Sequence, residues 1–140
     1  MSGRALVLGA LMAGIVDLAL GLGGAALWGG AALESALGTI GLTMQATVGV
    51  AVSHTLQRLV FGASTVWLYV AMRPRFARAG PTAIAAGLTA WLMIYVLSSW
   101  YLVAMGIFPL SLGVALVAWG LPEMVITTFA GAWIYERASR

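Results

Sequence analysis

Long apolar segments separated by short polar ones dominate the pattern of the chain. Four segments are mostly apolar and exceed the roughly 20 helical residues that cross a bilayer. They are residues 5–28, 48–72, 82–106 and 109–135. The most polar stretch, 73–81, separates the second and third segments, and its prolines and glycine predict a loop. The pattern therefore predicts an all-α protein, a membrane-embedded bundle of four transmembrane helices forming one domain over residues 1–140.

Residues 29–47, between the first two predicted spans, are only mildly polar. Their larger apolar side chains recur at helical spacing, and they are Leu33, Leu37, Ile40 and Met44. This periodicity favours a short helix that lies in the membrane interface.

Composition and charge place the chain outside the soluble class. Only 8% of its residues are charged, against about 25% in soluble domains. With four crossings, one side of the membrane receives Arg4, Arg73, Arg75, Arg78, Arg137 and Arg140, and the other side receives Glu34. Because basic residues stay on the cytoplasmic side, both termini are expected there, in a bacterial cytoplasmic (inner) membrane. The net charge of +3 is then a topology signal, and no nucleic-acid partner is expected.

The residue inventory excludes several kinds of chemistry. The chain has no cysteine and one histidine, which excludes disulfides, thiol chemistry and iron–sulfur clusters. A zinc site needs about three or four protein ligands, so no metal is expected. No nucleophile–base pair or nucleotide-binding loop appears, so neither catalysis nor a cofactor is expected. His54 could supply one axial imidazole to a haem or chlorophyll, but no other residue indicates a pigment.

Three charged residues interrupt the predicted spans: Asp17 in the first, Arg58 in the second and Glu123 in the fourth. Each lies about 13 to 15 residues from the cytoplasmic end of its span, or roughly 20 Å at ~1.5 Å per residue. Tyr95 lies at the same depth in the third span. A charge at the bilayer centre costs about 2.5–3.5 kcal/mol, so three such charges are expected to meet.

Each of these side chains also shares its helix face with small residues, a pattern typical of helix contacts. We therefore expect Asp17 and Glu123 to meet around Arg58 in a buried polar cluster. Tyr95 should hydrogen bond within it, and His54, one turn outward of Arg58, should connect it to the outer surface. The residues expected at its periphery are Gln57, Ser98, Ser99 and Thr127.

The fourth span carries a predicted helix break at Gly120 and Pro122. Proline lacks a backbone donor and should leave the carbonyl of Ala118 without its helical partner. Broken helices beside buried charges line solute sites in transporters, whereas many prolines in membrane helices only kink them. Both interpretations stay open at this stage.

One segment resembles a group of known sequences. It runs from Tyr69 through Arg73-Pro74-Arg75-Phe76 to Gly80-Pro81, with Trp91-Leu92 in the apolar helix that follows. This segment resembles small uncharacterised bacterial four-helix integral membrane proteins of about this length. The resemblance implies the same fold and no particular function.

Two functions fit these features best. The first is a non-catalytic membrane protein, a subunit or accessory of a larger assembly, whose buried charges hold its helices together. The second is an oligomeric transporter of small solutes coupled to protons or cations, with the cluster as its site. An enzyme acting on a lipid-soluble substrate has less support. The expected partners are the lipid bilayer and either further copies of the chain or other membrane subunits.

The topology can be tested with introduced cysteines, because the natural chain has none. Cysteine at Ala77 or Ser139 should react with an impermeant thiol reagent only from the cytoplasmic side, and cysteine at Ser35 only from outside. The unmodified chain is the blank. Labelling of the Ser35 variant from the cytoplasm would contradict the four-span arrangement.

Overall fold

The structure is a computed structural model that describes residues 3–140, and residues 1 and 2 of the predicted domain lie outside this range. Its elements are α1 (Gly3–Gly24), η1 (Ala25–Gly29), α2 (Gly30–Thr39), α3 (Val48–Met72), η2 (Arg73–Arg75), α4 (Ala79–Trp91), η3 (Leu92–Val96), α5 (Leu97–Ala104) and α6 (Leu110–Ala138). No strand occurs within residues 3–140, so the all-α prediction is confirmed.

Three continuous helices are long and apolar enough to cross a membrane: Gly3–Thr39, Ala79–Ala104 and Leu110–Ala138. The first of these extends well beyond the predicted 5–28, whereas the other two lie within a few residues of the predicted 82–106 and 109–135. Helix α3 has the predicted bounds, but polar residues in its first half make it less apolar than the other three. These features identify a membrane protein with transmembrane helices.

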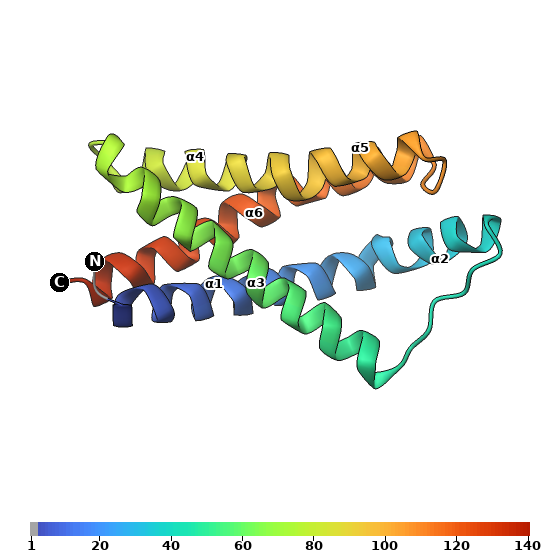
Figure 1. Cartoon of the computed structure of the whole chain (residues 1–140), viewed down its shortest axis with the longest axis horizontal. Helices are drawn as coiled ribbons and strands as arrows, with labels where there is room; N and C mark the ends of the chain where they lie inside the picture. Colours follow the sequence, from blue (N-terminus) through green and yellow to red (C-terminus); the bar gives the residue numbers. More distant parts are fainter. Residues whose placement is uncertain (1–2) are drawn as a thin grey trace.

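The first helix differs from the prediction, because it does not end near residue 28. A π-helical turn, η1, joins α1 directly to α2, so the expected separate helix is a continuation of the first (Figure 1). The helix then ends in a Schellman motif, in which Gly41 has a φ of 73° and the Leu42 amide donates to the Leu37 carbonyl at 3.0 Å. Met44 therefore lies beyond the helix, in the irregular segment that leads to α3.

Glycines set the distances between the packed helices. Helix α1 contacts both α3 and α6 along much of its length, and α4 packs on α6. A Cβ atom added at Gly62 of α3 would overlap the backbone of Gly14 in α1, and one at Gly9 would lie 2.9 Å from the Gly131 carbonyl oxygen of α6. Residues without side chains thus let three helix backbones approach closely, as is common between membrane helices.

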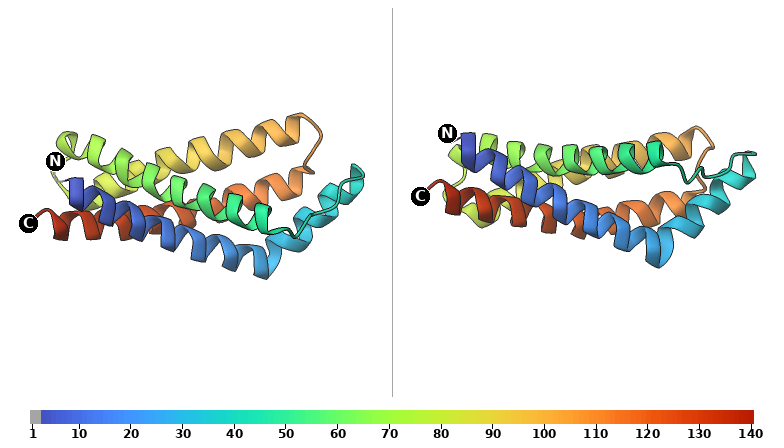
Figure 2. Two further views of the ribbon diagram at one scale, coloured as in Figure 1. Left: turned by 60° about the horizontal axis from the view of Figure 1, so that its bottom comes forward. Right: turned by 90° about the horizontal axis from the view of Figure 1, so that it is seen from below.

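The molecule is closely packed at one end and open at the other. The buried cluster at the first end comprises Ala13, Val66, Tyr69, Val70, Ala83, Ala86 and Ala132. The two termini and the turn between α3 and α4 lie at this end (Figure 2). At the opposite end α3 diverges from its neighbours (Figure 1), and residues 48–53 are all exposed.

A polar contact that was not predicted from the sequence joins α3 to α6 at the closely packed end. The Tyr69 hydroxyl donates to Glu136 Oε1 at 2.7 Å, and Arg73 Nε donates to the same oxygen at 2.9 Å. Arg73 Nη1 also donates to the Phe76 carbonyl at 3.1 Å. The hydrogen bond to Glu136 raises the pKa of Arg73 above its ordinary value. These bonds fix the turn after α3 against the end of α6.

Substitution of Gly62 tests the close approach of α1 and α3. Gly62→Ala should lower the free energy of unfolding by about 1–3 kcal/mol, because the added methyl group has no space. Gly23→Ala is the matched control, since no atom lies within 4 Å of its added Cβ. The control should be neutral or stabilising by up to about 1 kcal/mol, the difference in helix propensity. Equal stability of the two variants in detergent unfolding would contradict the packing described.

Candidate functional site: a buried charge cluster

Arg58 lies in the middle of α3, and its guanidinium rests against the backbone of α1. A Cβ atom added at Gly21 would lie 2.6 Å from Arg58 Cζ, so only glycine leaves room for the guanidinium. The side chain of Arg58 is 15% exposed, whereas that of Asp17 is 0% exposed and that of Glu123 is 1% exposed. The cation is thus the most exposed of the three charged side chains.

One nitrogen of Arg58 contacts side chains from three other helical segments. Arg58 Nη1 lies 2.7 Å from Glu123 Oε1 of α6, 3.1 Å from the Tyr95 hydroxyl of η3 and 3.5 Å from Asp17 Oδ2 of α1. This nitrogen has two hydrogens, so the two nearer acceptors take the stronger bonds. The structure therefore brings together the four residues that depth and helix face predicted, with Glu123 paired most closely.

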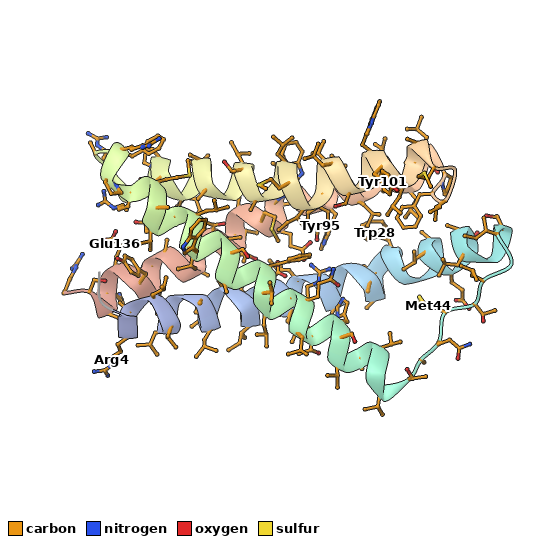
Figure 3. All side chains as sticks on the ribbon, in the orientation of Figure 1. Arg4, Trp28, Met44, Tyr95, Tyr101 and Glu136 are labelled. Carbon is orange, nitrogen blue, oxygen red and sulfur yellow. The ribbon has the colours of Figure 1, made fainter. Side chains whose placement is uncertain are left out.

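Tyr95 completes the environment of Glu123. Its hydroxyl donates to Glu123 Oε2, so both oxygens of this carboxylate are hydrogen bonded. Tyr95 belongs to the π-helical turn η3, and turns of this kind are frequent at functional sites. Figure 3 shows its side chain on the side of the continuous helix α4–η3–α5 that faces the other helices. A Cβ atom at Gly120 would overlap the Tyr95 ring, so this glycine makes room for it.

Asp17 is the less well satisfied of the two acids. Its side chain is fully buried, and its contacts are the Arg58 Nη1 at 3.5 Å and the Thr127 hydroxyl, which donates to Oδ1 at 3.4 Å. Both distances exceed the usual range of 2.7–3.2 Å. Glu123 and Asp17 thus differ in how strongly the cluster holds them.

His54 links the cluster to an open groove. Arg58 Nε donates to His54 Nε2 at 3.5 Å, across one turn of α3. His54 also borders a groove of about 680 Å³ at the open end of the molecule. The residues lining this groove are Thr47, Gly49, Val50, Ser53, His54 and Gln57. His54 therefore lies between the groove and Arg58 and contacts both.

The predicted peripheral residues divide into two groups. Thr127 contacts Asp17, as stated above. Gln57 and Ser98 are exposed and Ser99 is buried, and none of these three hydrogen bonds to the cluster within residues 3–140. The extra residue in the π-helical turn η3 shifts the helix face that follows it by one position. This shift turns Ser98 away from the helix contacts.

The predicted helix break is wrong, because α6 runs without interruption from Leu110 to Ala138. Pro122 is exposed, and Ala118, whose carbonyl was expected to be free beside the cluster, lies on the exposed side as well. The Trp91 indole donates to the Val117 carbonyl at 2.8 Å, in the turn before the proline. This bond goes to Val117, and not to Ala118, whose carbonyl loses its helical donor at Pro122.

An aromatic pair lies next to the cluster and was not predicted as part of it. The Trp119 and Trp28 rings meet edge to face with centroids 6.2 Å apart. A Cβ atom at Gly24 would lie 2.6 Å from Trp119 Nε1. The indole therefore packs against the backbone of α1, one turn beyond Gly21, where Arg58 makes its contact. Trp119 Nε1 is buried without a hydrogen-bond partner among the described residues. The sequence signal for this contact was the spacing of Gly21 and Gly24 on one helix face.

The charge balance of the cluster determines which ions it can take up. Within residues 3–140, no group of three or more His, Cys, Asp or Glu side chains is placed to hold a metal ion. With both acids ionised and His54 neutral, two carboxylates face one guanidinium and leave one excess negative charge. The cluster therefore has the capacity to take up one proton or one monovalent cation.

Comparisons with known proteins identify no relative. No family model, curated protein or solved structure matches the chain. The resemblance of the segment around residues 69–92 to small bacterial four-helix proteins therefore stays a prediction.

Removing Arg58 tests whether the cluster members depend on one another. Arg58→Leu should lower the free energy of unfolding by about 3–5 kcal/mol, because it leaves two carboxylates buried without a cation. The triple variant Asp17→Asn, Arg58→Leu, Glu123→Gln should recover much of this loss, since no buried charge remains. Gln57→Leu, one residue away and exposed, is the control and should change stability by less than about 0.5 kcal/mol.

Unfolding in detergent micelles, followed by circular dichroism, gives the free energy of unfolding of the native chain and of the three variants. A triple variant no more stable than Arg58→Leu would show that the three side chains do not meet.

Proposed function

We propose that the chain is a non-catalytic integral membrane protein that crosses the bacterial inner membrane four times with both termini in the cytoplasm. In this proposal its buried charges fix the arrangement of its helices, and it serves as a subunit or accessory of a larger membrane assembly. The observation that carries the proposal is the contact of one guanidinium nitrogen, Arg58 Nη1, with side chains of α1, η3 and α6.

The length and position of α3 support a fourth crossing. Its 25 residues measure about 37 Å at ~1.5 Å per residue, more than the roughly 30 Å of the hydrocarbon core. Its charged residue, Arg58, faces acids of two other helices, so little charge is left for lipid to accommodate. The two termini and the α3–α4 turn lie at one end of the molecule (Figure 2), and the arginines outside the cluster belong to these segments. By the positive-inside rule this end is cytoplasmic.

The distribution of charges over the helices supports a structural role for the cluster. Each charged member comes from a different helix, and each alone would cost about 2.5–3.5 kcal/mol in the bilayer. The costs are offset only when the helices pack with Asp17, Arg58 and Glu123 at one depth. Such a cluster selects one rotation and one register for every helix, a role well established for single buried polar residues in coiled coils.

The open end of α3 supports membership of a larger assembly. Ser53, His54 and Gln57 line the groove, and Ser53 and Gln57 are exposed. Polar groups facing lipid are costly, because the hydrocarbon offers them no hydrogen bonds. Another copy of the chain or a different membrane subunit would supply the missing contacts.

A proton- or cation-coupled transporter, working as an oligomer, is the second candidate. The excess negative charge of the cluster and its link to the groove through His54 favour it. Transport also requires access from the opposite side, and there the contact of Gly9 with Gly131 and the fully buried Val66 and Tyr69 fill the space between the helices. Since this packing would have to open in every cycle, the structural role is the stronger candidate.

Flux into liposomes separates the two candidates. We expect vesicles that contain the purified chain to take up protons, sodium, potassium and small amines at the rate of empty vesicles under an imposed pH gradient. Glu123→Gln should give the same result. Uptake above the empty-vesicle rate that Glu123→Gln abolishes, with the helical content unchanged, would replace the structural proposal with transport.

A further inference from the structure

Six of the seven basic residues gather at one end of the molecule, here called the arginine end. They are Arg4, Arg73, Arg75, Arg78, Arg137 and Arg140. They come from three segments that are distant in sequence, namely the start of α1, the α3–α4 turn and the end of α6, and these segments meet at one end in both views of Figure 2. Figure 3 places Arg4 and Glu136 at this end, opposite Met44 and Tyr101.

The positive charge of this end is largely uncompensated within the chain. Its acid, Glu136, is already bound by Arg73 and by the Tyr69 hydroxyl. Arg75 and Arg78 of the turn are exposed, and neither forms a salt bridge within residues 3–140. Their guanidinium groups are therefore free to bind an anion from outside the chain.

Aromatic side chains at the same end set the depth at which these cations lie. The Arg137 guanidinium stacks over the Trp133 ring, with Cζ 3.9 Å from the ring centroid. Trp133 and Trp67 are 53% and 60% exposed. Exposed tryptophans settle at the level of lipid headgroups. In a membrane, a guanidinium stacked on such a ring is expected at the level of the lipid phosphates.

We propose that the arginine end is a binding surface for anionic phospholipid headgroups of the cytoplasmic leaflet. Guanidinium pairs with phosphate through two parallel hydrogen bonds, and clustered arginines beside a transmembrane helix attract anionic lipid over neutral lipid. This inference rests on the orientation given in the proposed function. It goes further than a topology signal, because orientation needs only the number of arginines, whereas binding needs them free and at headgroup depth.

Native mass spectrometry of the full chain in nanodiscs tests the surface. The nanodiscs contain equal parts of phosphatidylglycerol and phosphatidylcholine with matched acyl chains, and the lipids that stay bound after release are counted. The native chain should retain phosphatidylglycerol preferentially. The double variant Arg75→Gln, Arg78→Gln should lose at least about fivefold of that preference. The charge-preserving variant Arg75→Lys, Arg78→Lys should keep most of it.

Salt provides a second readout, because it screens exposed charges. The preference measured at 0.1 M salt should fall steeply at 1 M. Glu34→Gln, at the opposite end, is the control that alters net charge by one unit without touching the surface, and it should leave the preference unchanged.

The outcomes distinguish this inference from the proposed function. Equal retention of both lipids by the native chain would overturn the inference, and a protein would then be the partner of the arginine end. A preference that survives in the double Gln variant would overturn it as well. A chain that fails to float with pure phosphatidylcholine vesicles after carbonate washing would instead contradict the membrane-spanning proposal itself.

Discussion

A cation held among apolar helices is the constraint on which the rest of the structure depends. Lipid offers no hydrogen-bond acceptors, so the guanidinium of Arg58 must find them on neighbouring helices. It finds Glu123 at 2.7 Å, the Tyr95 hydroxyl at 3.1 Å and Asp17 at 3.5 Å. These contacts require α1, α4–α5 and α6 to meet α3 at one depth. Because buried ion pairs contribute little net stability, we propose that the main effect of the cluster is on which packing the chain adopts.

Steric features make this electrostatic solution possible. Glycine at position 21 leaves space for the guanidinium, and glycine at position 120 leaves space for the Tyr95 ring. The π-helical turn η3 places that ring against α6. Toward the arginine end, the approach of Gly62 to the Gly14 backbone brings α1 and α3 close enough for Arg58 to reach Asp17. The polar contacts and the backbone spacing thus depend on each other.

Much of this arrangement could be predicted, because few solutions exist for a charge in the bilayer. The length of the apolar segments predicted the helices. The equal depth of Asp17, Arg58 and Glu123 in their spans predicted that these three residues meet. The π-helical turns could not be predicted, since tertiary contacts stabilise the extra residue. Glu136 looked like an ordinary charge at a helix end, and only the fold brings Tyr69 to it. Gly120, which was predicted as part of a helix break, instead leaves space for the Tyr95 ring, and a sequence pattern cannot distinguish these two roles of a glycine.

Double-mutant cycles on the free energy of unfolding test the central claim most directly. One cycle combines Arg58→Gln with Glu123→Gln, and the other combines Arg58→Gln with Asp17→Asn. Residues in one network couple by about 0.5–3 kcal/mol. We expect coupling in both cycles, and a larger value for Glu123, whose carboxylate lies closer to Arg58 Nη1. Additive effects in the Arg58–Glu123 cycle would show that the cation does not organise the helices.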